Sequence, residues 1–210
     1  MSEKNNYNEF LIKSFVDEFG DETNEKFLGT SVEGTFKNTA TTGDKLLVKI
    51  LFSKKELVRF DFFDYGDKPS NLGLLDSDKD KWFMLAKKNG EKHNISGSVN
   101  GSSWAPHKDR NYKFGLTYAD KVLELFKTGS TTKFLLTKSD STDTIYNFSI
   151  NVNGNDFSTK LSSLGITTKE TQPSRPFWLN FLLKITLLDL LIKICKVPIV
   201  LLKKVQTKKE

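Results

Sequence analysis

The chain has one cysteine, Cys195, among its 210 residues. A single cysteine excludes an intramolecular disulfide, and it excludes zinc or iron–sulfur sites that need several thiolates. The two histidines, His93 and His107, are not spaced as a metal-binding pair, and we expect both at the surface. The near absence of thiols suits a reducing compartment.

Common catalytic and nucleotide-binding motifs are also missing. The sequence has no G-x-S-x-G nucleophile elbow, no G-x-G-x-x-G loop and no Walker loop. We therefore expect a non-enzymatic protein that uses no cofactor and no metal. An enzyme that builds its site from the loop-like stretches 66–80 and 97–110 is a more distant alternative.

Residues 1–174 lack a net charge, although the whole chain has a formal charge of +6. Residues 175–210 hold eight basic and two acidic residues, which leaves 24 of each sign in the preceding part. A neutral domain has no overall field to attract a phosphate backbone, so we expect no nucleic-acid partner.

The first residues, MSEKNNYNEFLIKSF, contain no continuous apolar run and no small-residue cleavage site. They therefore do not resemble a secretory signal, and we expect the domain in the cytoplasm.

Period-two alternation of apolar and polar residues is abundant up to about residue 165. It is clearest in KLLVKILF at 45–52, ELVRFDFFDYG at 56–66 and TIYNFSINV at 144–152. Further strands are expected at 10–15, 27–36, 82–88, 91–96, 113–117 and 133–137. Short linkers at 53–55 and Asn89-Gly90 predict hairpins.

Two helices interrupt the strands. Tyr118 to Lys127 places Val122, Leu123, Leu125 and Phe126 on one broad face and is followed by Gly129. Asp156 to Leu164 predicts a second, shorter helix. Eight or nine short strands with one or two helices predict a mainly β fold, specifically a β-sandwich over residues 1–165.

The composition changes after the domain. Residues 166–176 are polar, contain two prolines and are expected to be a linker. Residues 177–210 predict an apolar, amphipathic C-terminal helix with a basic end. Phe177 and Trp178 open it, and Thr186, Asp189, Lys193 and Lys196 would share one face within roughly 80°. The proposed membrane-binding residues are Phe177, Trp178, Leu183, Leu187, Leu191, Lys203, Lys204, Lys208 and Lys209.

Three interpretations of this segment stay open. Residues 177–202 are long enough to span a bilayer, but each central charge would cost roughly 2.5–3.5 kcal/mol. An interfacial helix would keep its charged face in water and place the lysines against anionic lipid. A third arrangement packs the helix on its own domain, on a protein partner through residues 177–204, or in a homo-oligomer.

Other motifs have a functional and a structural interpretation. The acidic stretch from Asp17 to Glu25 is a calcium-site candidate or a solvated turn, and we favour the turn, with Gly20 at positive φ. Asp76, Asp78 and Asp80 begin like an EF-hand, but Lys81 and Lys87 stand where glycine and glutamate are required. Trp104 is a candidate loop-tip aromatic that stacks on a ligand, or a core residue.

The segment Asp17-Glu18-Phe19-Gly20-Asp21, with the strands around it, resembles a group of proteins from Bacteroidetes that carry a DEFGD-type loop. The stretch IYNFSINVNGNDFSTKLSSL is similar in pattern to invasion-associated locus B-like proteins. This resemblance covers about residues 10–165 and implies a β-sandwich without an enzymatic centre. Members of the group are often exported, whereas this chain begins without such a signal and carries the basic tail.

Overall fold

The computed structural model describes residues 7–73, 81–139 and 141–166. The strands are β1 (Leu11–Val16), β2 (Glu22–Lys37), β3 (Thr42–Phe52), β4 (Arg59–Asp64), β5 (Lys68–Pro69), β6 (Trp82–Lys88), β7 (Glu91–Asn100), β8 (Ser103–Pro106), β9 (Ser130–Lys138) and β10 (Ser141–Val152). The helices are the 3₁₀ helix η2 (Lys113–Gly115), α1 (Tyr118–Lys127) and α2 (Gly154–Ser163).

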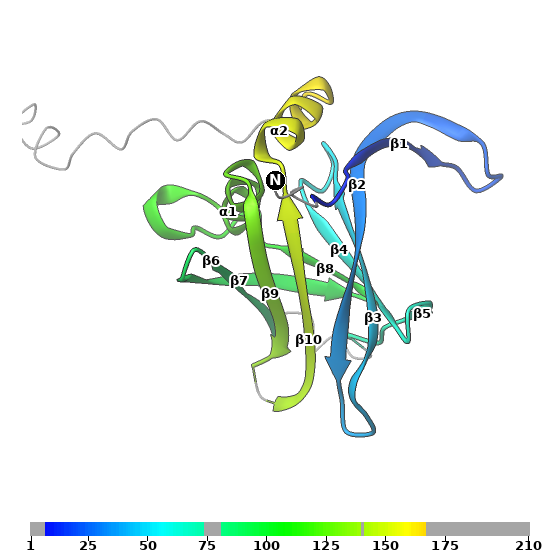
Figure 1. Cartoon of the computed structure of the whole chain (residues 1–210). Coiled ribbons are helices and arrows are strands. Elements are labelled where there is room, and N and C mark those ends of the chain that lie inside the picture. The colour runs from blue at the N-terminus through cyan, green and yellow to red at the C-terminus, as the bar shows by residue number, and fades with distance from the viewer. Residues whose placement is uncertain (1–6, 74–80, 140, 167–210) are drawn as a thin grey trace, which may run out of the picture. The chain divides into compact units, whose positions relative to one another are not determined.

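The predicted β-sandwich is wrong, because the strands close into one barrel (Figure 1). Eight strands form the ring in the order β2-β10-β9-β6-β7-β8-β4-β3, and β3 pairs with β2 again. All the pairings are antiparallel. β1 pairs with β2 outside the ring, and β5 pairs with β4.

Closure depends on the length of β2, which pairs along most of β3 and, at its end, with β10. The pairing of β2 with β10 runs from Gly34↔Phe148 to Lys37↔Ile145. A Cβ on Gly34 would lie 2.3 Å from the Asn147 carbonyl oxygen, so glycine permits the close approach of the two strands. Alternation sets which side of a strand is buried, but it is the same for a barrel and a sandwich.

The barrel interior is filled by aromatic side chains. Phe134 stacks on Phe148 with ring centroids 5.1 Å apart, and Phe60 contacts both rings. Trp104 is fully buried against Phe60, and Gly97 gives its indole room, because a Cβ there would come within 2.4 Å of the ring. An eight-stranded barrel has an interior of about the size that side chains can fill.

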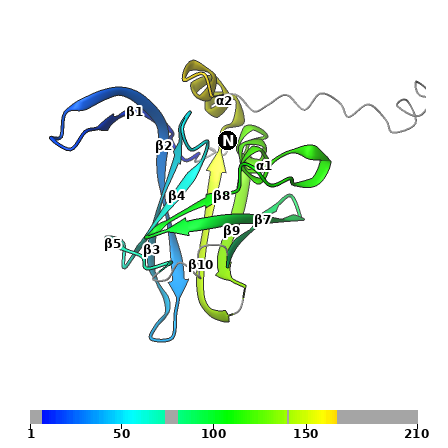
Figure 2. The ribbon, with the colours of Figure 1, turned by 180° about the vertical axis from the view of Figure 1, so that it is seen from behind.

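One end of the barrel is covered by α1 and α2 (Figures 1 and 2). Phe126 of α1 and Phe157 of α2 meet Phe10 and Phe52 in a cluster with centroid separations of 4.9–6.0 Å. Both helices were predicted and are confirmed. A capping box between Thr117 and Asp120 begins α1, and Asn153 caps α2.

Several local predictions are also confirmed. Asn89 and Gly90 have φ of 48° and 84°, as a type I′ turn requires, and they join β6 to β7. Residues 53–58 join β3 to β4 as the expected hairpin, through a connection longer than the predicted 53–55. Other local predictions are wrong. Residues 113–117 contain a 3₁₀ helix rather than a strand, and 97–110 contain β8 and the end of β7 rather than one loop. Residues 22–25 begin β2 rather than continuing the acidic turn, and the loop expected at 66–80 contains β5.

The predicted linker and the C-terminal segment 177–210 lie outside the described residues. None of the helices in the described ranges is both long enough and apolar enough to cross a membrane.

Candidate binding groove

The hairpin of β1 and β2 forms an arm that projects from the barrel (Figures 1 and 2). Its tip is the acidic stretch 17–21, where the Asp17 carboxylate accepts hydrogen bonds from the backbone N–H groups of Phe19 and Asp21, both at 2.9 Å. Gly20 has φ +90°, which confirms the turn predicted for this position. The Asp17 carboxylate therefore stabilises the tip of the arm.

The base of the arm is hydrogen-bonded to the end of β10 and to α2. Asn8 N–H donates to the Asn151 carbonyl at 2.7 Å, and Asn151 N–H donates to Asn8 Oδ1 at 2.8 Å. Lys160 Nζ of α2 donates to the Phe10 carbonyl at 3.0 Å. These bonds fix where the arm leaves the barrel.

The turn from Ser53 to Leu57 lies opposite the arm. Its ends exchange two backbone hydrogen bonds, Leu57 N–H to Ser53 O at 2.9 Å and the reverse at 3.3 Å. Ser53 Oγ accepts from Glu56 N–H, and Lys108 Nζ donates to the Lys55 carbonyl. The turn is thus held by its own hydrogen bonds and by the bond from Lys108. These bonds fix the backbone positions of Lys54 and Lys55.

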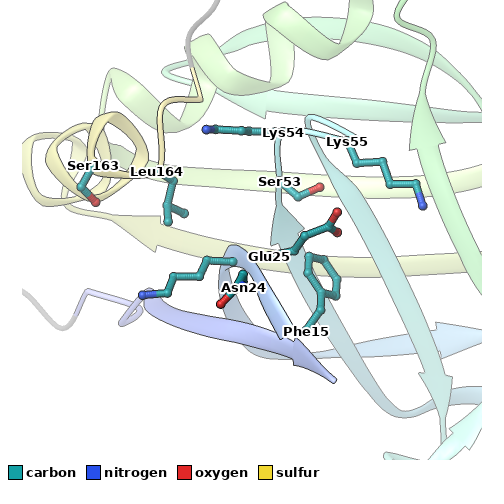
Figure 3. A pocket seen from close by; sticks show the side chains of 9 residues that line it. Phe15, Asn24, Glu25, Ser53, Lys54, Lys55, Ser163 and Leu164 are labelled. Carbon is teal, nitrogen blue, oxygen red and sulfur yellow. The ribbon is translucent and has the colours of Figure 1, made fainter. Parts of the chain in front are cut away.

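Between arm and turn lies a groove of about 550 Å³, with an adjoining hollow of about 370 Å³ (Figure 3). Both hollows are lined by Phe15, Glu25, Ser53 and Lys55, so they form one continuous depression. Figure 3 shows side chains from β1, β2, the turn and the end of α2 converging on it. We call this depression the arm groove.

The floor of the arm groove is partly apolar. The half-buried Phe15 packs on Phe27 with ring centroids 4.7 Å apart, and Leu164 lines the groove after α2. On the arm itself, Val16 is 62% exposed and Phe19 is 82% exposed. Large exposed apolar side chains beside a concave surface are typical of binding sites.

The rim of the arm groove is basic. Lys26, Lys54 and Lys55 are exposed, and none has an ion pair within the described part of the chain. Arg59, in contrast, is bound by Glu56 at 2.9 Å and Asp61 at 3.0 Å. Three lysines thus face one lining carboxylate in the larger hollow, that of Glu25.

Lys54 is positioned by the end of α2. Gly165 has φ +63°, and a Cβ there would lie 3.2 Å from Lys54 Cε. The ammonium therefore lies near the C-terminal end of α2, where the helix dipole favours a cation.

His93 is buried, with 3% of its surface exposed, so its predicted surface position is wrong. Its place on β7 faces the packing of η2 and α1 rather than solvent. Nδ1 is 2.9 Å from the Tyr112 hydroxyl, and Glu91 lies 3.6 Å away. Burial and the nearby Lys121 lower the pKa of His93 below its ordinary value, although Glu91 acts in the opposite direction. His107 is half-buried.

Lys88 is buried near His93, and its ammonium forms hydrogen bonds at the C-terminal end of α1. Its ammonium donates to the Leu125 carbonyl and to Thr128 Oγ1 at 2.6 Å. Burial lowers the pKa of Lys88, with Lys121 adding to the effect. The Leu125 carbonyl also accepts from Thr128 Oγ1 at 3.2 Å, so the ammonium reinforces hydrogen bonding at the C-terminal end of α1.

A further buried polar cluster lies where β4, β5 and β10 meet. Ser70 Oγ donates to Asp64 Oδ1, and burial raises the pKa of both Asp64 and Tyr146. Ser70 is 3% exposed. This cluster satisfies polar groups inside an apolar core.

Trp104 is the other aromatic singled out in the sequence, and it is a core residue. It belongs to β8, and its Nε1 donates to the Trp82 carbonyl at 3.5 Å. It therefore has no exposed ring face to stack on a ligand.

The remaining candidate metal-binding and membrane-binding residues lie either along the arm or outside the described residues. The carboxylates of the acidic stretch 17–25 lie along the arm, and among the described residues no group of three His, Cys, Asp or Glu side chains could hold a metal ion. Asp76, Asp78 and Asp80 lie outside the described residues, as do all nine predicted membrane-binding residues from Phe177 to Lys209.

Sequence reasoning missed the arm groove. In the sequence Phe15 is one of several residues of the strand expected at 10–15, Lys54 and Lys55 are hairpin-turn residues, and no motif joins the two places. One signal was present: FLIKSFV followed by DEFGD puts exposed apolar side chains beside a tight turn.

Comparisons with protein-family models, with curated proteins and with solved structures return no match for this chain.

Proposed function

We propose that the protein is a non-enzymatic binding module held at the cytoplasmic face of a membrane by residues 177–210. The observation that carries this proposal is the separation of charge and hydrophobicity along the chain. The whole net charge of +6 lies in 175–210, beside the longest apolar stretch. Apolar side chains and clustered lysines together are the two signals that stable peripheral association needs.

The arm groove supports the binding part of the proposal. It is a concave surface with an apolar floor and a basic rim, built from elements that the barrel holds in place. The C-terminal segment would bring the domain to the membrane, and the arm groove would bind a partner there.

Flotation with anionic liposomes tests the anchor. The full chain should float with the liposomes, and a chain that ends at residue 174 should not. Changing Lys203, Lys204, Lys208 and Lys209 together to Gln should weaken binding mainly at low salt, because each lysine adds about 1 kcal/mol of screened attraction.

The matched apolar variant is Leu187→Ser with Leu191→Ser, which should weaken binding at every salt concentration. On neutral liposomes the lysine changes should matter little. A full chain that stays monodisperse without detergent and ignores anionic liposomes would contradict the anchor. It would favour the alternative, a soluble interaction protein whose C-terminal helix docks on its own domain or mediates oligomerisation.

A further inference from the structure

The inference starts from a difference in length between two paired strands. β3 ends at Phe52, which pairs with Leu28, but β2 begins at Glu22. Within residues 22–27, β1 pairs with Glu22, Lys26 and Phe27, with a register shift across 23–25, and among the described residues no strand pairs with the other edge. An exposed strand edge presents N–H and C=O groups that can pair with another chain.

Glu25, in the irregular part of β2, has a weak local hydrogen bond in place of a strand partner. Glu25 N–H donates to the Thr23 hydroxyl two residues away, at 3.3 Å. This is a long bond to an exposed side chain, and an incoming carbonyl would replace it at little cost.

The arm groove runs beside the same edge. Asn24, Glu25 and Lys26 of the edge line it, and the turn with Ser53, Lys54 and Lys55 forms the facing wall. A strand laid in the groove would continue the direction of β3, with one face on Phe15 and the other side chains near the lysines of the turn.

We propose that the arm groove binds an extended acidic segment of another protein by strand addition to residues 22–27 of β2. Lys26, Lys54 and Lys55, which have no ion pair with any described residue, select carboxylates, and the Phe15–Phe27 pair offers a platform for one apolar side chain. Main-chain pairing supplies affinity, and alternate side chains supply specificity. The edge fits a core of about six residues. This inference deepens the binding role proposed above and rests on it.

The test uses the full chain in lipid-free solution and three fluorescent peptides. The first is EVEFEVE with blocked ends, the second replaces each Glu with Lys, and the third carries N-methyl groups on alternate amides. Fluorescence anisotropy should show binding of the first peptide, and affinity weaker by about tenfold or more for the other two. Amide NMR should show the Glu25 N–H shift on binding.

The variant that locates the site is Lys54→Glu with Lys55→Glu, which should lose about tenfold in affinity for EVEFEVE. Lys92→Glu, an exposed lysine on β7, is the matched control and should bind normally. Phe15→Ser should also weaken binding, and retention of the wild-type melting temperature would confirm that its fold survives.

Equal binding of the three peptides, or binding that ignores Lys54 and Lys55, would overturn the proposal. A dimer that forms without peptide and is lost in Lys54→Glu with Lys55→Glu would assign the edge to a second copy instead. Anionic-vesicle binding that needs these two lysines and survives truncation at residue 174 would assign the groove to lipid. Because the peptide test uses no lipid and the flotation test no peptide, failure of one leaves the other result standing.

Discussion

At the residue scale, the two buried basic side chains near α1 differ most from what their types suggest. His93 and Lys88 lie on adjacent strands of one hairpin, and both have lowered pKa values because burial disfavours their charged forms. Each is held by a specific partner, His93 by Tyr112 and Lys88 by the end of α1. The two side chains therefore stabilise the packing of α1 and Tyr112 against the β6–β7 hairpin.

For His93 we predict a loss of stability in mild acid. In the unfolded chain the imidazole titrates near its ordinary pKa of 6.5, and in the folded chain that pKa is lower. Below about pH 6.5 the unfolded state binds more protons, so the free energy of unfolding falls as pH decreases. Urea unfolding at about pH 7.5 and pH 5.5 measures this. His93→Gln should show a smaller decrease, and an equal decrease would assign the effect to other groups.

For Lys88 we predict that Lys88→Met lowers the free energy of unfolding by about 2 kcal/mol. The methionine fills a similar volume but removes the ammonium's hydrogen bonds to the Leu125 carbonyl and to Thr128 Oγ1, and leaves that carbonyl only the 3.2 Å bond from Thr128 Oγ1. Lys87→Met, on the exposed side of the same strand, should change stability by less than about 0.5 kcal/mol. Equal effects of the two changes in thermal unfolding would show that the buried ammonium adds nothing.

At the element scale, the short pairing of β2 residues 34–37 with β10 residues 145–148, here called the seam, decides whether the sheet closes into a barrel. Gly34 lies in this seam, and the oxygen of Asn147 occupies the space that a side chain would need. We predict that Gly34→Ala lowers stability by about 2 kcal/mol, because the strands must separate to admit the methyl group. Thr35→Ala, at the next and exposed position, should cost much less in the same denaturant titration. A neutral Gly34→Ala would mean that the seam tolerates a wider spacing.

The elements themselves were largely predictable, and their pairing was not. KLLVKILF and TIYNFSINV alternate in the sequence and are strands in the structure, and the Asn89-Gly90 turn requires two residues with positive φ. Nothing in an alternating pattern says which strand lies beside which. The true length of β2 was hidden because its first residues, Glu22 to Lys26, are polar on both faces where it leaves the barrel.

The candidate groove was unpredictable for a related reason. Its residues come from positions 15–26, 53–59 and 163–164, and folding alone brings them together. The surface position expected for His93 rested on its residue type, whereas alternation with Ile95 and Val99 places it on the buried face of β7. The membrane-binding residues were nominated on composition, and they stay a prediction.

At the scale of the whole molecule, residues 1–170 form a compact unit with its own aromatic core. We predict that a chain ending at residue 170 folds alone and unfolds in one cooperative transition. Its far-ultraviolet circular dichroism should be dominated by β structure with a small helical part. A mainly helical spectrum, or a broad transition, would contradict this.

The hydrogen bonds that join Asn8 to Asn151 and Phe10 to Lys160 have a consequence for synthesis on the ribosome. The first strand of the domain receives its anchoring partners only after almost the whole domain has been translated. Until then the two edges of the unfinished sheet are unpaired and its aromatic face is open to water. Exposed apolar surface and unpaired strand edges make an incomplete chain prone to aggregation, and the closed topology forms only in a late, nearly post-translational step.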